Sequence, residues 1–179
     1  MYRIDKLLKQ DRKLFHTADL SVIWGITNKN TLYKLISRYL QKQVLFPVYK
    51  GLYSTVDPNG IDPILLGATA INTYCYLSTE SVLYSSGVIS QKVYPYTFVS
   101  SVSKRFVVSG VEYISRMMKP EFLLNTSGIE QKGDVFVAST ERAVADMLYY
   151  NPKYYFDKPD LVDWKGVKKI QKEVGYDRG

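Results

Sequence analysis

Apolar residues recur every three or four positions between residues 31 and 40, and this is the clearest structural signal in the chain. They are Leu32, Leu35, Ile36, Tyr39 and Leu40. Spacings of three and four residues place side chains on one stripe of an α-helix, whereas a strand would alternate every second residue. The pattern therefore predicts a helix that begins near Asn30 or Thr31 and buries this stripe.

Two short apolar runs follow this helix and predict a β-hairpin. Residues 44–48 and 51–55 flank Tyr49-Lys50, and Gly51 supplies the glycine expected in a tight turn. The hairpin would therefore carry a basic tip. A helix followed directly by a hairpin is the order found in a winged helix-turn-helix.

The first 25 residues are expected to supply the other helices of that arrangement. The segment from Ile4 to Phe15 is mostly charged but has apolar anchors, including Leu8, and reads as a first helix. A second, short helix runs to about Trp24, with Thr17 as its N-terminal cap and Gly25 as its stop. His16 is interpreted as a surface or capping residue.

A turn cluster at residues 57–60 marks the expected domain boundary, which gives domains of residues 1–60 and 61–179. Asp62-Pro63 begins a new helix, residues 74–77 form a strand, and Ser78 caps a further helix. Short β-rich runs follow at residues 94–100, 106–108, 111–115, 122–125 and 134–138, before a helix over residues 139–148. The tail from Tyr149 to Gly179 predicts no more than a short helix. The fold class is therefore α+β: a winged helix-turn-helix followed by a mixed α/β domain with a small sheet.

The positive charge is concentrated in the first third of the chain. Of the net charge of +7, residues 1–60 contribute +6, from ten lysines and arginines and four acidic residues. This asymmetry is typical of a nucleic-acid-binding module joined to a neutral partner domain, although a basic face is often only solvating.

The residue inventory excludes several kinds of chemistry. With one cysteine, Cys75, and one histidine, no internal disulfide or Cys/His metal cluster can form, and phosphate-loop and nucleotide fingerprints are missing. Asp160 and Asp163 before Lys165 are too close together for a nuclease site. We therefore expect no enzyme activity, cofactor or bound metal. No run of about 18 apolar residues or signal peptide is present, so a cytoplasmic protein without membrane contact is expected.

Double-stranded DNA is the partner predicted by the polar face of the helix and by the hairpin tip. Lys34 and Arg38 are the best candidates for reading guanine or gripping phosphate, while Asn28 and Asn30 either read adenine or, the interpretation we favour, cap the helix. The full set of candidate contacts is Asn28, Lys29, Asn30, Thr31, Tyr33, Lys34, Ser37, Arg38, Tyr49 and Lys50.

Two motifs downstream resemble a known family. The segment Leu77-Ser78-Thr79-Glu80-Ser81-Val82-Leu83-Tyr84-Ser85-Ser86-Gly87 and the later segment Val137-Ala138-Ser139-Thr140-Glu141-Arg142-Ala143-Val144-Ala145-Asp146-Met147-Leu148 are similar to those of AbiEi antitoxins, from bacterial type IV abortive-infection toxin–antitoxin systems. The resemblance covers residues 5 to 150 and its motifs are helix starts, not catalytic signatures. It does not extend to the segment from Phe156 to Gly179.

The resemblance implies a two-part protein. The winged helix would bind inverted repeats in its own promoter and repress the operon. The second domain would act as antitoxin to a co-transcribed nucleotidyltransferase-like toxin, with no stable complex required. An alternative hypothesis makes the winged helix and the sheet a protein-interaction module without specific DNA binding.

Overall fold

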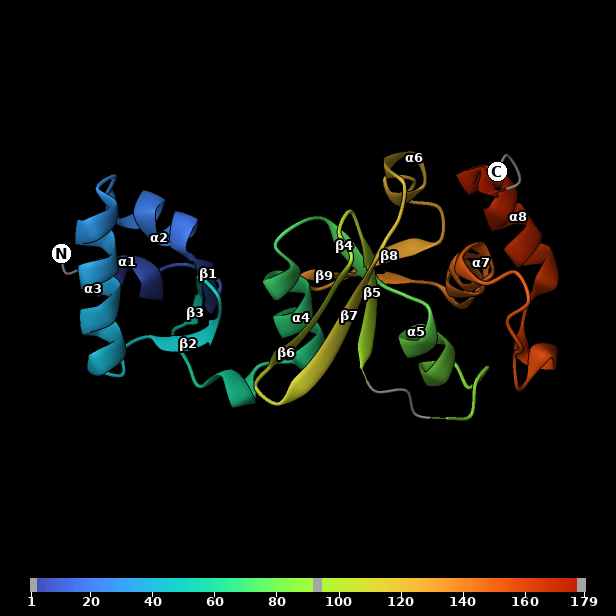
Figure 1. The fold of residues 1–179 in the computed structure, drawn as a ribbon, viewed down its shortest axis with the longest axis horizontal. Coiled ribbons are helices and arrows are strands. Elements are labelled where there is room, and N and C mark those ends of the chain that lie inside the picture. Colours follow the sequence, from blue (N-terminus) through green and yellow to red (C-terminus); the bar gives the residue numbers. More distant parts are fainter. Residues whose placement is uncertain (1–2, 92–94, 177–179) are drawn as a thin grey trace. The chain divides into compact units, whose positions relative to one another are not determined.

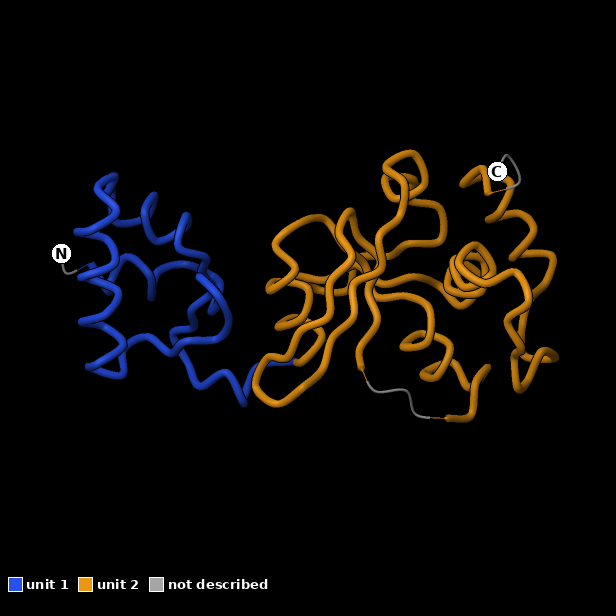
Figure 2. The backbone as a smooth tube through the Cα atoms, in the orientation of Figure 1, with its two compact units in different colours: residues 1–62 blue, residues 63–179 orange. Residues whose placement is uncertain are grey.

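The chain folds into two compact units that both contain helices and strands. The structure, a computed structural model, describes residues 3–91 and 95–176 (Figure 1). Unit 1 comprises residues 1–62 and unit 2 residues 63–179 (Figure 2). In the described part of the chain, none of the helices has the length and apolar character needed to cross a bilayer.

Unit 1 combines three helices with a small antiparallel sheet. In chain order its elements are α1 (Arg3–Leu8), β1 (Leu14–His16), α2 (Thr17–Trp24), α3 (Lys29–Gln41), β2 (Phe46–Tyr49), β3 (Leu52–Ser54) and the 3₁₀ turn η1 (Pro58–Gly60). β3 lies between β1 and β2 and pairs antiparallel with both.

One apolar core holds the helices of unit 1 together. The predicted stripe of α3 faces this core, with Leu32 and Ile36 buried and Leu35, Tyr39 and Leu40 partly buried. Trp24 of α2 packs against the ring of Tyr39, with centroids 5.5 Å apart. The remaining buried members of the core are Leu7, Phe15, Leu20, Ile26 and Leu45. The apolar face of α3 is therefore fixed inward, and its polar face is directed outward.

Two sequence predictions for unit 1 are wrong. The helix expected from Ile4 to Phe15 ends at Leu8, which is 67% exposed and no anchor, and residues 14–16 form strand β1. The cap of α2 is His16 and not Thr17: the carboxylate of Asp19 accepts a hydrogen bond from the His16 N–H at 2.7 Å. The predicted stop at Gly25 is confirmed, since this glycine has a positive φ of 63°.

Unit 2 is built on a mixed six-stranded sheet with the order β6-β7-β5-β4-β9-β8. β5 pairs parallel with β7 and β4 with β9, while the other neighbours are antiparallel. The strands are β4 (Cys75–Leu77), β5 (Tyr96–Ser100), β6 (Lys104–Val108), β7 (Val111–Met117), β8 (Ile129–Lys132) and β9 (Val135–Ala138).

Helices cover both faces of this sheet. α4 (Pro63–Ile71) lies on one face, and α5 (Glu80–Ser85) and α7 (Thr140–Tyr150) lie on the other (Figure 1). α8 (Trp164–Val174) packs against α7 and forms an outer layer, after the 3₁₀ turn η2 (Pro159–Leu161). The helix predicted over residues 139–148 is confirmed as α7, and the Ser139 hydroxyl caps it by accepting from the Arg142 N–H at 3.2 Å.

The structure also corrects predictions for unit 2. The strand expected at residues 122–125 is replaced by α6 (Pro120–Leu123) and a turn, since proline at the first helical position favours a helix start. The N-cap of α5 is Thr79, while the Ser78 hydroxyl donates to Asp146 at 2.7 Å. Strand β8 was not predicted. Tyr94, expected at the start of a strand, lies outside the described residues.

Candidate nucleic-acid interface

The outer face of α3 is a continuous polar surface. At 100° per residue, Asn30, Lys34, Ser37 and Gln41 fall along one line, with Tyr33 and Arg38 on its two sides. All six side chains are exposed. The helix therefore presents two cations together with amide, hydroxyl and phenol groups in one place.

Neither α3 nor the sequence on either side of it adds an acidic side chain to this surface. The sequence has no aspartate or glutamate between Asp19 and Asp57, a stretch that carries Lys29, Lys34, Arg38, Lys42 and Lys50. A phosphate group approaching the outer face of α3 meets only attractive charges from this segment.

Asn28 and Thr31 form the N-terminal cap of α3. The side-chain oxygen of Asn28 accepts hydrogen bonds from the Thr31 N–H at 3.0 Å and from the Thr31 hydroxyl at 3.3 Å. This is the geometry of an N-cap, which satisfies a backbone donor that has no partner within the helix. Asn30, by contrast, points to the exposed side of the helix and is not its cap.

The hairpin turn lies beside the start of α2. The Gly51 carbonyl accepts hydrogen bonds from the Thr17 N–H at 2.8 Å and from the Thr17 hydroxyl at 3.2 Å. Gly51 has a φ of 68°, which lets the chain reverse in two residues. Lys50 precedes it and is exposed, while Tyr49 is part of β2 and half-buried.

The ten predicted contact residues thus fall into three groups. Asn30, Tyr33, Lys34, Ser37 and Arg38 share the outer face of α3. Asn28, Lys29 and Thr31 lie at its first turn, and two of these form the cap. Tyr49 and Lys50 belong to the hairpin, whose turn is hydrogen-bonded to α2.

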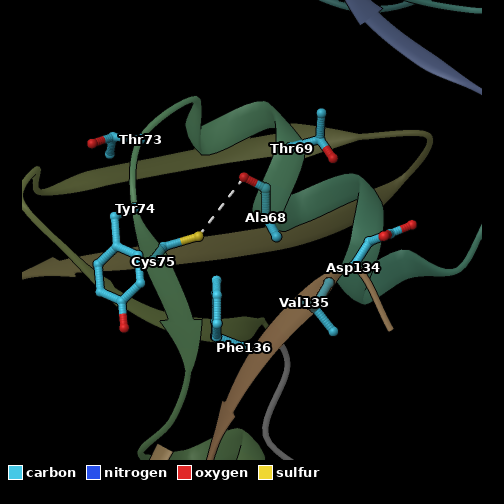
Figure 3. Close-up of a pocket in the computed structure, with 8 residues that line it drawn as sticks. All are labelled: Ala68, Thr69, Thr73, Tyr74, Cys75, Asp134, Val135 and Phe136. Carbon is cyan, nitrogen blue, oxygen red and sulfur yellow. Dashed lines mark hydrogen bonds between the residues drawn. The ribbon is translucent and has the colours of Figure 1, made fainter. Parts of the chain in front are cut away.

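A shallow pocket in unit 2 has a volume of about 180 Å³. Figure 3 shows that it lies between the end of α4 and the strands β4 and β9, with the Cys75 thiol directed to the Ala68 carbonyl at 3.8 Å. Burial raises the pKa of Cys75 to about 12, so the thiol stays protonated at neutral pH and is not a nucleophile. Carbon atoms provide most of the lining, which includes Phe136 and Val135.

The described residues hold no group of three or more His, Cys, Asp or Glu side chains placed to bind a metal ion. Asp163, one of the acids in the apparent nuclease pattern, instead caps α8 by accepting the Lys165 N–H at 3.1 Å. Asp160 lies on the 3₁₀ turn before it and is exposed.

The buried charges of unit 2 belong to one hydrogen-bonded network around Arg142 on α7. Its Nε donates to Asp146 at 2.8 Å, and its two terminal nitrogens donate to the Tyr76 hydroxyl and to three backbone carbonyls. Asp146 also accepts from Ser78 and from Tyr176. Both charged side chains are fully buried, so the network joins α7, β4 and the chain end from within.

Comparison with known proteins identifies no family. A scan of family models and a search of curated proteins gave no match to this chain. The geometry of α3 is therefore the main basis for a functional assignment.

Gln41 lies on the polar face of α3 that the period predicts, and it extends that face by one turn beyond the predicted contact residues. One feature, the buried network of unit 2, was not among the sequence predictions. The pairing of Arg142 with Asp146 has a signal too: opposite charges four residues apart with only Ala143-Val144-Ala145 between them.

Proposed function

We propose that this protein is a DNA-binding transcriptional repressor that regulates its own operon and acts as antitoxin to a nucleotidyltransferase-like toxin. Unit 1 is the DNA-binding part and has the order of a winged helix-turn-helix, with α3 as recognition helix and the β2–β3 hairpin as a short wing. Unit 2 carries the antitoxin activity.

The observation that carries the DNA-binding proposal is the exposed, acid-free outer face of α3 opposite a fully apolar inner face. A helix of 13 residues is about 20 Å long, and the major groove of B-DNA admits such a helix. Lys34 and Arg38 lie one turn apart, where both reach base edges or the phosphates beside them. The hairpin tip, Tyr49 and Lys50, supplies a second contact with an adjacent phosphate or with the minor groove.

The antitoxin proposal is supported by the resemblance of residues 77–87 and 137–148 to AbiEi antitoxins. These segments include Ser78, Arg142 and Asp146, which meet in the buried network. The motif residues therefore build the interior of unit 2, and its antitoxin activity requires an intact fold and not a reactive side chain.

The test is a gel-shift titration of the full chain against the DNA upstream of its gene. Lys34→Ala or Arg38→Ala should weaken binding by about 1–3 kcal/mol if the residue reads a base, and should reduce the salt slope by about one unit if it contacts phosphate. Lys9→Ala, which removes an exposed lysine after α1, is the matched control and should bind as the parent does.

Unchanged binding by both α3 variants would remove α3 from the DNA. If the parent protein fails to shift this DNA at any salt concentration, the protein-interaction hypothesis replaces the repressor. Co-expression with the neighbouring nucleotidyltransferase-like toxin tests the other half of the proposal. The Lys34→Ala/Arg38→Ala protein should still rescue growth, because that activity is assigned to unit 2.

A further inference from the structure

The outermost helix of unit 2, α8, carries its own row of cations, separate in sequence from those of α3. α8 has four lysines, Lys165, Lys168, Lys169 and Lys172, within its 11 residues. All four are exposed. At 100° per residue they occupy a sector of about 100°, so they form one face. We call this the lysine face of α8.

The opposite side of α8 fixes the direction of this face. Val167 and Val174 are buried and Ile170 is partly buried, where α8 packs against α7. A helix held on its apolar side cannot rotate its lysines inward. The lysine face is consequently a permanent part of the surface of unit 2.

Most of this charge is not neutralised within the protein. Lys169 lies 3.8 Å from Glu173, but among the described residues Lys165, Lys168 and Lys172 take part in no ion pair. Asp163 lies at the start of the helix, where it accepts from the backbone. Three unpaired cations on one short helix attract a polyanion.

An aromatic ring continues the same row. Trp164 precedes Lys168 by one turn, as Lys168 precedes Lys172, so the three form a ridge about 12 Å long. The indole N–H donates to the Pro159 carbonyl at 3.1 Å, and Phe156 meets the ring edge-on at 5.9 Å. The ring is thus held in place while 40% of the residue remains exposed.

We propose that the lysine face of α8, together with Trp164, binds single-stranded nucleic acid through its phosphodiester backbone and one stacked base. Proteins that bind single-stranded nucleic acid commonly place cations along its phosphate backbone and stack its bases on exposed aromatic rings. A protein partner fits less well, because protein interfaces are depleted in lysine and have an apolar centre, which this face does not have. The bases of a duplex are not accessible to Trp164.

The experiment isolates this surface in the full-length protein. Lys34→Ala/Arg38→Ala serves as background, so that α3 contributes little. Fluorescein-labelled oligo(dT) and oligo(U) of about 20 nucleotides are titrated by anisotropy at several salt concentrations, and the two probes distinguish DNA from RNA. Lys165→Gln/Lys168→Gln/Lys172→Gln is compared with Lys132→Gln/Lys153→Gln/Lys158→Gln, which removes the same charge from exposed positions elsewhere in unit 2.

The background protein should bind both oligonucleotides. The α8 triple variant should lose about tenfold or more in affinity at low salt and about two units of salt slope, at about 0.7 per phosphate contact, while the control should keep both. Trp164→Leu, which keeps the apolar contact with Phe156, should lose about fivefold or more without a change in slope. Circular dichroism should show that each variant is folded.

Equal binding by the two triple variants would overturn the proposal. It would also be overturned if polyglutamate displaced the oligonucleotide as well as unlabelled oligo(dT), which would indicate an acidic protein partner, or if a duplex competed equally well. Because the α3 contacts are already removed in the background, these outcomes are independent of whether unit 1 binds operator DNA.

Discussion

An amide at the start of a helix can serve either the helix or a ligand, and at Asn28 the contacts favour the helix. Its oxygen accepts from both the backbone and the side chain of Thr31. A side chain held in this way fixes the start of α3, whose outer face is the proposed recognition surface. Lys34 and Arg38, two and three turns along, have exposed side chains suited to contact DNA.

Substitution of Asn28 separates the two roles. Asn28→Ala should destabilise unit 1 by about 1 kcal/mol, whereas Asn28→Ser, which restores a capping oxygen, should recover the stability. The Ser variant should also bind operator DNA like the parent, as measured by urea denaturation and gel shift. A Ser variant that is stable but binds poorly would show that the amide reads a base.

Arg142 makes five side-chain hydrogen bonds within unit 2. A guanidinium has five N–H donors, and here they meet Asp146, Tyr76 and the carbonyls of Asn125, Ser127 and Phe122. Burial works to lower the pKa of Arg142, but the charge of Asp146 raises it overall, so the guanidinium stays charged. Lysine cannot reproduce this planar set of bonds.

Breaking this pair should therefore be costly. Asp146→Asn leaves the guanidinium without a counter-charge and should lower the free energy of unfolding by about 3–5 kcal/mol. Arg142→Met should cost a similar amount, and Arg142→Met combined with Asp146→Leu should lose clearly less than the sum of the two single variants. Urea denaturation measures all of these. Strict additivity would contradict the coupling.

At the scale of elements, the position of α4 depends on a glycine, although glycine is ordinarily unfavourable inside a helix. A Cβ at Gly67 would lie 2.4 Å from Cδ1 and Cε1 of Tyr113 and 3.0 Å from Cε2 of Phe98. Tyr113 is fully buried, stacks on Phe106 at 5.2 Å and donates to the Pro63 carbonyl at 2.8 Å. Its ring has no room to move away, so α4 approaches the sheet only because residue 67 has no side chain.

Gly67→Ala reverses the usual sign of a helix substitution. Glycine to alanine within a helix ordinarily stabilises by about 0.5–1 kcal/mol, but the overlap with Tyr113 should make this change destabilising by about 1–3 kcal/mol. Gly60→Ala, where nothing lies within 4 Å, should stay within about 0.5 kcal/mol of the parent. Thermal denaturation of both variants checks the prediction, and a stabilised Gly67→Ala protein would contradict it.

The elements that the sequence predicts well are those with a long repeat. α3 repeats its apolar period over three turns, so its burial pattern follows from spacing alone. β1 has only three residues, and its pairing with β3 joins positions such as Phe15 and Tyr53, which lie far apart in the chain. A segment this short has no measurable period, so the pattern places Leu14 and Phe15 in a helix, whereas they form a strand.

The sequence likewise predicts one part of the candidate site and not another. The outer face of α3 follows from its period, but the place of the hairpin turn depends on the Thr17–Gly51 hydrogen bonds, which no local pattern indicates. In unit 2, capping propensity predicts Ser78 as a helix cap, whereas its hydroxyl donates to Asp146 on another helix. Capping propensity reflects the local sequence around a residue, and it does not indicate which distant side chain that residue will contact in the fold.

At the scale of the whole molecule, several buried groups of unit 2 keep their protons at high pH. Burial raises the pKa of Cys75 from 9.0 to about 12. The pKa values of Tyr76, Tyr150 and Tyr176 are raised from 10.0, first by burial and then by the charge of Asp146. Once unfolded, each of these groups would lose its proton near its ordinary pKa.

Alkaline pH should consequently destabilise unit 2. Above about pH 9 the folded state binds more protons than the unfolded state, so stability is fully present below that pH and falls as the pH rises, on the order of 1.4 kcal/mol per pH unit for each such group. The two tryptophans provide separate reporters, Trp24 in unit 1 and Trp164 in unit 2. The urea midpoint of Trp164 emission in Trp24→Phe protein should fall between about pH 9 and pH 11, and Cys75→Ala should lessen the early part of that fall. A midpoint that stays constant over this range would mean that these groups titrate alike in the folded and unfolded chains.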